Sequence, residues 1–289
     1  MNVMPNAVSQ EAGSAGLCSR PALGETTVGG TTQPVTWQLP EETPVALQIN
    51  SEPYTVMMAT PADLRDFTIG FLVGEGIVKN ARDIQGVLVM PVESGMAVDV
   101  AVPETSLETS RLARRAIEGR TGCGLCGVED IASALRPLPI LARSWSPATD
   151  VIQRAAEGLF QHQPMNRLNR SVHGAAWVSQ DGQILLVRED VGRHNALDKL
   201  IGWALEAGKI PLSDDVLLVS GRVSYEIVQK AIAASIPFIA AVGAPSSLAV
   251  ELSDRFNLTL VGFLRAESMN VYTHEERILA NDEGKRDSC

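Results

Sequence analysis

The alternation of helical and strand patterns over residues 196–264 constrains the fold more than any other feature of this chain. Apolar residues recur every three or four positions in the helical stretches, and short runs rich in Val, Leu, Ile and Ala separate them. This pattern predicts an α/β sandwich with a mainly parallel sheet, whose ligand-binding loops lie at the carboxyl ends of the strands. The expected order is helix 196–207, strand 216–220, helix 225–234, strand 238–242, helix 247–256 and strand 258–264.

The N-terminal half shows a smaller α+β pattern. Residues 45–49 and 54–58 predict a hairpin, and Thr60 is predicted as the N-cap of a helix with Pro61 at its first position. We expect further strands at 87–90 and 96–102, a helix at 107–118, a helix at 150–160, and a hairpin of 175–179 with 183–187.

Composition and proline positions suggest how the chain divides. Residues 1–38 are rich in Gly, Ser, Thr and Ala without a period, which predicts a disordered tail. Pro137, Pro139 and Pro147 mark a boundary. We therefore expect a smaller α+β domain over 39–145, ending in a mobile loop, and a larger α/β domain over 146–289.

The overall composition excludes several classes of protein. The 289 residues carry a net charge of -10, and an acidic chain without a basic stripe is a poor nucleic-acid binder. Four cysteines are too few for a secreted disulfide framework, and Cys18 and Cys289 lie in polar end segments. There is no signal-peptide pattern and no apolar run of the ~20 residues that a membrane span requires. We expect a cytoplasmic protein that binds neither nucleic acid nor membrane.

Cys123 and Cys126 are three residues apart in the glycine-rich stretch 121–127. Two cysteines at this spacing serve as half of a metal site, as a redox dithiol, or as a carrier of sulfur in a persulfide. A zinc site needs two more ligands, and the spacing of His173 and His194 fits no zinc module. A deaminase site needs His-x-Glu, but Ala175 stands where the glutamate is required. A thioredoxin motif should follow a strand, whereas these cysteines follow a predicted helix. These arguments favour a carrier loop and a protein without a metal of its own.

Three predicted strand ends are followed by an arginine. Arg193 and His194 precede a helix with Asn195 as its expected N-cap; Ser220 and Arg222 lie in a second loop, and Arg265 in a third. Three such loops can form one crevice for a polyanionic ligand, because a helix N-terminus and guanidinium groups both bind phosphate.

Each of these loops also has a purely structural interpretation. Arg193 can pair with Glu189 or Asp190 on the surface, Ser224 can simply cap a helix, and the stem of Arg265 can cover Phe263. His173 lies in a polar loop before a strand, and its residue type and position do not decide between a structural and a functional role.

Together these motifs resemble the formate dehydrogenase accessory sulfurtransferase family over roughly residues 41 to 274. The chain departs from the family just before His173, where Arg-Ser-Val stands at 170–172 in place of paired glycines. The matching motifs lie at 58–61, 70–72, 75–77, 123–127, 190–196, 198–199, 220–226, 244–247, 262–265 and 270–272.

The resemblance implies a cytidine deaminase-like three-layer α/β sandwich with a smaller added domain. It implies that Cys123 accepts sulfur from a cysteine desulfurase as a persulfide, with Cys126 assisting, and passes it to the molybdenum bis(guanine dinucleotide) cofactor of formate dehydrogenase. It places cofactor binding at Phe263, Leu264, Arg265, Ala266, Glu267 and Ser268.

Two other functions remain open at this stage, a cytoplasmic disulfide oxidoreductase and a non-catalytic chaperone that inserts the cofactor. The sequence does not decide between a monomer and a homodimer.

Overall fold

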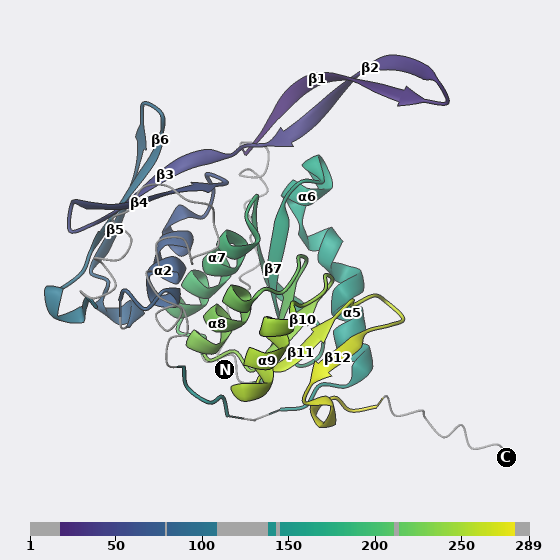
Figure 1. Cartoon of the computed structure of the whole chain (residues 1–289). Coiled ribbons are helices and arrows are strands. Elements are labelled where there is room, and N and C mark those ends of the chain that lie inside the picture. The colour runs from purple at the N-terminus through teal and green to yellow at the C-terminus, as the bar shows by residue number, and fades with distance from the viewer. Residues whose placement is uncertain (1–17, 79, 109–137, 143–144, 211–213, 281–289) are drawn as a thin grey trace, which may run out of the picture.

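The structure is a computed structural model that describes residues 18–78, 80–108, 138–142, 145–210 and 214–280 (Figure 1). A six-stranded sheet with the order β12-β11-β10-β9-β7-β8 forms its centre. The strands are β7 (His173–Val178), β8 (Ile184–Asp190), β9 (Val216–Val219), β10 (Phe238–Ala241), β11 (Thr259–Gly262) and β12 (Asn270–Thr273).

Four of these strands, β8 to β11, run in the same direction. β9, β10 and β11 pair in parallel, while β7 is antiparallel to both β8 and β9, and β12 is antiparallel to β11. The prediction of a mainly parallel sheet is therefore right for strand direction but wrong for neighbour pairing. The strand β7, which forms a hairpin with β8, lies between β8 and β9 and is antiparallel to both. The carboxyl ends of β8 to β11 share one edge of the sheet.

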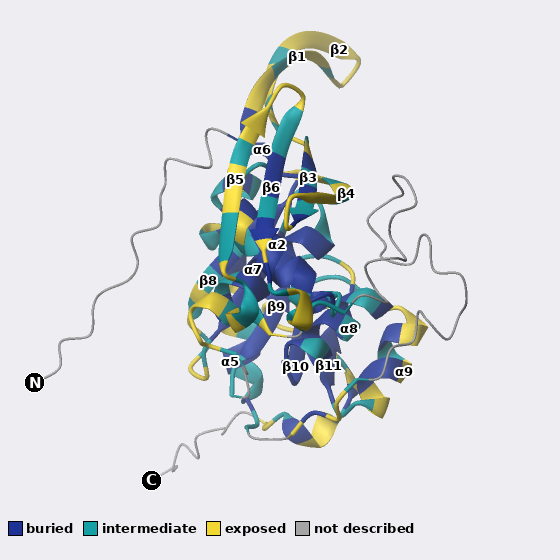
Figure 2. Ribbon diagram, turned by 90° about the vertical axis from the view of Figure 1, so that its left-hand side faces the viewer, coloured by how far each residue is buried: buried dark blue, intermediate teal, exposed yellow. Residues whose placement is uncertain are grey.

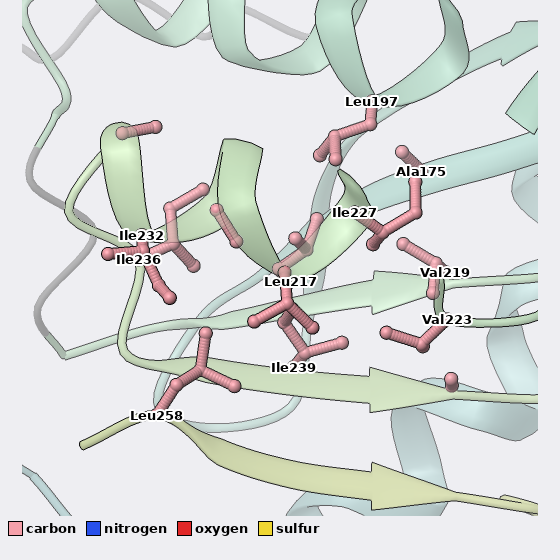
Figure 3. Packing of buried hydrophobic residues seen from close by; sticks show 14 of the residues in the cluster. Ala175, Leu197, Leu217, Val219, Val223, Ile227, Ile232, Ile236, Ile239 and Leu258 are labelled. Carbon is pink, nitrogen blue, oxygen red and sulfur yellow. The ribbon is translucent and has the colours of Figure 1, made fainter. Parts of the chain in front are cut away.

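Helices cover both faces of this sheet, which confirms the predicted three-layer α/β sandwich. Apolar residues of α7, α8 and α9 pack on one face and those of α5 on the other. Right-handed crossovers between strands added in one direction place all their helices on the same face. Figure 3 shows Leu197 and Ile227 from the helices above Leu217 and Ile239 from the strands. The helices are α5 (Thr149–Leu159), α6 (Pro164–Asn169), α7 (Arg193–Glu206), α8 (Tyr225–Ala233) and α9 (Ser247–Arg255).

The N-terminal part adds a four-stranded sheet with the order β4-β3-β6-β5 and one helix, α2 (Leu64–Gly74). Phe67 and Phe71 of α2 are buried against Leu47 and Val98 of the sheet. The predicted strands and the helix that follows Thr60 are present, but the N-cap of α2 is Asp63 rather than Thr60. Of the helix predicted at 107–118, residues 109–118 lie outside the described part of the chain. The strands are β3 (Thr43–Ile49), β4 (Glu52–Ala59), β5 (Gly86–Val92) and β6 (Gly95–Ala101).

A two-stranded ribbon, β1 (Ser19–Val28) with β2 (Thr31–Pro40), occupies residues that we predicted to be a disordered tail. Residues 1–17 lie outside the described part of the chain. Gly29 and Gly30 have φ of 58° and 82° and form the two-residue turn that such a hairpin requires. The prediction of disorder is wrong for 19–38, because paired glycines serve in a hairpin turn as well as in disordered segments. Cys18, at the base of the ribbon, is buried beside Met165 and Val172.

Helices α2 and α7 cross at very short range, and two glycines make the crossing possible. A methyl group on Gly70 would lie 1.8 Å from the Asp198 carbonyl oxygen, and one on Gly202 would lie 1.9 Å from the Asp66 carbonyl oxygen. Ion pairs at the ends of the crossing join Arg65 to Glu206 and Arg188 to Asp66. Through this contact the N-terminal sheet is attached to the larger sandwich (Figure 1).

No helix in the described ranges is long and apolar enough to cross a membrane.

Substituting alanine for Gly70 or Gly202 should destabilise the protein by at least the ~1–3 kcal/mol typical of overpacking, since backbone cannot move aside as a side chain can. Gly158→Ala is the matched control, because Gly158 lies in α5 with its nearest neighbour, Ile184 Cδ1, at 3.5 Å from the added carbon. This control should be neutral or slightly stabilising, since alanine is the better helix former. Urea unfolding of the three variants measures the differences. Equal stability of Gly70→Ala and the parent would contradict the assigned crossing.

Candidate functional site

The loops that follow β9, β10 and β11 contact one another at the carboxyl edge of the central sheet. The Val223 amide donates to the Ala244 carbonyl at 3.1 Å, and the Phe263 amide donates to the Gly243 carbonyl at 3.1 Å. A side chain on Gly243 would lie 2.5 Å from the Gly221 carbonyl oxygen, so only glycine lets these two loops touch. These strand-end loops therefore meet at one edge of the sheet, as expected, while their forming one crevice for a polyanion stays a prediction.

Four basic side chains gather at the end of this edge nearest β7. A carbon added to Gly221 would lie 3.1 Å from His173 Nδ1 and 3.5 Å from Arg193 Cβ, so these three residues adjoin. Burial lowers the pKa of His173, and Arg193, His194 and Arg222 lower it further, while Asp190 opposes the shift. The guanidinium groups of Arg193 and Arg222 are thus close enough to disfavour a proton on the His173 imidazole.

Arg193 is not used in the surface ion pairs that the sequence offered as an alternative. The Glu189 carboxylate accepts hydrogen bonds from the amides of Met165 and Asn166, and Asp190 pairs with Lys199. Arg193 Nε is buried and has no hydrogen-bond partner within the described ranges. As the first residue of α7, Arg193 lies at a helix N-terminus, where free amides and the helix dipole favour an anion.

His194 Nε2 lies 2.8 Å from Glu226 Oε2 and 3.2 Å from Ser224 Oγ. Both partners come from the start of α8, so this contact fixes the first turn of α7 against the first turn of α8. Ser224 is the N-cap residue of α8, as the sequence suggested, but its hydroxyl lies against His194 and makes no capping bond. Glu226 was missed as a site residue, since only the tertiary fold brings it to His194.

Asp190 is fully buried and determines the path of the chain before Arg193. Its carboxylate lies 2.7 Å from Lys199 Nζ and accepts hydrogen bonds from the amides of Thr60 and Gly192 and from Asn195 Nδ2. Lys199 Nζ also donates to the carbonyls of Thr60 and Glu189.

The predicted N-cap role of Asn195 is wrong. The N-cap of α7 is Gly192, and Asn195 lies inside the helix, where its side chain also donates to the Met58 carbonyl at 2.9 Å. Ser220 has a structural task as well, because its hydroxyl accepts a hydrogen bond from the Gly174 amide at 2.8 Å.

The segment from Phe263 to Ser268 follows β11 on the far side of the β10 loop from His173. Phe263 has φ of 51° and is 45% exposed, whereas the Leu264 side chain is buried in the core and leaves only backbone for a ligand. Arg265 Nη1 donates to the carbonyls of Val242 and Leu264, and its amide donates to the Ser268 carbonyl. Ala266, Glu267 and Ser268 are exposed. Arg265 thus borders the same edge but is separated from the other arginines by one loop.

Cys123 and Cys126 lie outside the described residues. In the part of the chain that the structure does describe, no three His, Cys, Asp or Glu side chains are arranged to hold a metal ion. The expectation that the protein has no metal of its own stays a prediction.

Comparison with known proteins decides the family. A model of the FdhD/NarQ family matches residues 40–279. The chain belongs to the FdhD/NarQ family. Proteins named sulfur carrier protein FdhD are 42% identical to this member in two organisms: over 250 residues in Xanthomonas euvesicatoria, covering 86% of this chain and 89% of the relative, and over 237 residues in Variovorax paradoxus, covering 82% and 85%.

A solved structure supports the fold of this FdhD/NarQ family member. The crystal structure, of a protein from Desulfotalea psychrophila described as a formate dehydrogenase accessory protein, is 28% identical with a TM-score of 0.74. It covers 91% of this chain and 100% of that protein.

The pKa of His173 reports the positive charges around it. In an NMR titration of the imidazole signals, His173 should titrate below the usual value of about 6.5. Arg193→Ala should raise the midpoint, because it removes a repelling charge and admits water, and Arg222→Ala should raise it less. Arg265→Ala should leave the midpoint unchanged. An equal effect of all three substitutions would show that the arginines form a single cluster and would contradict the arrangement described.

Proposed function

We propose that this protein is a sulfur carrier that activates a formate dehydrogenase. Cys123 accepts sulfur from a cysteine desulfurase as a persulfide and delivers it to the molybdenum bis(guanine dinucleotide) cofactor, which is the substrate of the transfer. Family membership supports the accessory role, and the names of the 42% identical relatives support sulfur carriage.

The observation that supports the proposed substrate is the group of basic side chains at the carboxyl edge of the central sheet. Arg193, His194 and Arg222 lie near one another at the N-terminus of α7, and Arg193 Nε has no partner within the described ranges. The net charge of the protein is -10, yet basic side chains are concentrated at this edge of the sheet. Such a local concentration of positive charge favours a ligand with several phosphates. A guanine dinucleotide has such phosphates, and the Arg265 segment extends the same edge.

The two thiols would have different tasks. In loading, the Cys123 thiolate attacks the outer sulfur of the donor persulfide, and the desulfurase thiolate leaves. Release of that sulfur as sulfide needs two electrons. The Cys126 thiolate supplies them when it attacks the inner sulfur, which forms a Cys123–Cys126 disulfide and expels sulfide.

The first test separates loading from release. After incubation with a cysteine desulfurase and cysteine, intact mass should show one added sulfur atom on the parent and on Cys126→Ser, but none on Cys123→Ser. Cys126→Ser should then fail to release sulfide unless a reductant is added. Cys289→Ser is the control, since it removes a thiol without touching the pair.

Two outcomes would favour the other candidate functions. Full activation of formate dehydrogenase by Cys123→Ala protein would indicate a chaperone that only inserts the cofactor. Turnover of insulin disulfides without a sulfur donor would indicate an oxidoreductase.

The second test concerns the guanine nucleotide. GDP, a fragment of the substrate, should bind, and Arg193→Ala, Arg222→Ala or Arg265→Ala should each weaken binding by about 1.5–3 kcal/mol, the contribution of a charged hydrogen bond. Isothermal calorimetry measures this as a roughly 10- to 150-fold change in Kd. Arg154→Ala is the control, because Arg154 is exposed on α5 and pairs with Asp150. Unchanged affinity in all three variants would refute the assigned site.

A further inference from the structure

His173 is the residue of this edge whose role the sequence does not decide, and the structure gives its imidazole a defined place. His173 begins β7 and is opposite Asp190, the last residue of β8, so it lies at the carboxyl edge. A carbon added to Gly221 would lie 3.1 Å from His173 Nδ1 and 3.5 Å from His173 Cε1, so the ring lies against the loop after β9. The side chain is half-buried, and within the described ranges neither ring nitrogen has a hydrogen-bond partner. Both nitrogens are therefore available to a ligand.

Charged or titratable groups face this imidazole from each element packed around it. Arg193 and His194 face it from the start of α7, and Arg222 from the loop after β9. Asp190 faces it from the end of β8 and carries the opposing charge. The helix α7 is buried along most of its length (Figure 2), so its first turn holds Arg193 and His194 in fixed positions. Burial first, and then these basic groups, hold the pKa of His173 below its ordinary value, so the imidazole is neutral at neutral pH when no ligand is bound.

The acidic side chains Asp190 and Glu226 at this edge already have partners. The Asp190 carboxylate lies 2.7 Å from Nζ of the fully buried Lys199, and Glu226 Oε2 lies 2.8 Å from His194 Nε2. Neither carboxylate can turn to His173 without leaving a buried partner unpaired, which is costly. The negative charge that would favour a proton on His173 therefore comes from outside this group of residues.

We propose that His173 contacts the phosphates of the bound ligand and takes up a proton as they bind. This inference rests on the proposed function, since it takes the polyanion bound at this edge to be the substrate. The phosphates bring several negative charges next to the imidazole and compensate the guanidinium groups of Arg193 and Arg222, which favours the imidazolium form. The imidazolium then donates a charged hydrogen bond to a phosphate oxygen. The proton comes from the solvent, and no covalent bond is made or broken.

Proton uptake makes the affinity for the ligand depend on pH in a defined direction. Because the ligand raises the proton affinity of His173, protons raise the affinity for the ligand by the same factor. The affinity therefore increases as the pH falls from above the midpoint of His173 in the complex to below its midpoint in the free protein. Each pH unit that separates the two midpoints corresponds to a tenfold change in Kd. Loss of one proton thus weakens the binding of a ligand that must later leave.

The first test is an NMR titration of the histidine signals of the full-length protein, with and without saturating GDP. The midpoint of His173 should be higher in the complex than in the free protein, and His173→Asn identifies its signal. His162 is the internal control, since it lies in η4 (Phe160–His162) after α5, contacts the Gly158 carbonyl, and should titrate alike in both states. A midpoint of His173 that GDP leaves unchanged would overturn the inference.

The second test measures the consequence for affinity, by calorimetry of GDP binding over a series of pH values. Kd of the parent should fall more steeply with falling pH than that of His173→Asn, by the factor that the two NMR midpoints predict. Titration of the GDP phosphates is common to both proteins, so the comparison isolates the imidazole. His162→Asn is the matched control and should behave as the parent does, and circular dichroism checks that each variant is folded. If His194→Gln rather than His173→Asn removed the added pH dependence, the proton would belong to His194 and the inference would be wrong.

Failure of this inference can be told apart from failure of the proposed function. A parent that did not bind GDP at any pH would overturn both. A parent that bound GDP, with the losses of affinity expected of the arginine variants but with the same pH dependence as His173→Asn, would overturn this inference alone.

Discussion

The buried ion pair of Asp190 and Lys199 is the interaction on which the position of the candidate site depends. Both side chains have no exposed surface, and every polar neighbour that they contact belongs to a segment next to the site. Removing one member of such a pair costs about 3–5 kcal/mol, because the other charge is left buried without a partner. The pair therefore holds the end of β8, the start of α7 and the chain after β4 in one arrangement. Arg193 and His194 follow directly from that fixed point.

The same pair makes the N-terminal part of the chain a component of the larger sandwich. The Thr60 amide donates a hydrogen bond to the Asp190 carboxylate, and the Thr60 carbonyl accepts one from Lys199 Nζ. The Thr60 hydroxyl accepts a hydrogen bond from the Val191 amide. A second buried cation, Lys230 of α8, contacts Asp198 of α7 and Glu75 after α2. Burial raises the pKa of the Asp198 carboxyl to about 6, although Lys230 opposes the shift. Together with the close crossing of α2 and α7 at Gly70 and Gly202, these polar contacts attach the N-terminal part of the chain to the larger sandwich.

Local patterns in the sequence predicted the elements well and the tertiary contacts poorly. The strand-end loops of Arg193, Arg222 and Arg265 could be predicted, because apolar periodicity locates the strands and parallel strands end at one edge. Thr60 and Asn195 were both predicted as N-caps from residue type, yet each uses its side chain for a partner more than 100 positions away, Val191 and Met58 respectively. The pairing of Glu226 with His194 is equally invisible to a local pattern. The ribbon was missed because glycine and threonine are common in both disordered segments and exposed hairpins.

The contrast between the buried and the exposed charges has a consequence for how the protein responds to ionic strength. Dissolved ions screen charges that are in contact with water and have little effect on charges that water does not reach. Asp190 and Lys199 belong to the second class, while Arg222 and Arg265 are exposed and belong to the first. Added salt therefore weakens attraction of a polyanion to the carboxyl edge while leaving the geometry of that edge intact. Affinity for the ligand and integrity of its site are in this way governed by different charges of the same protein.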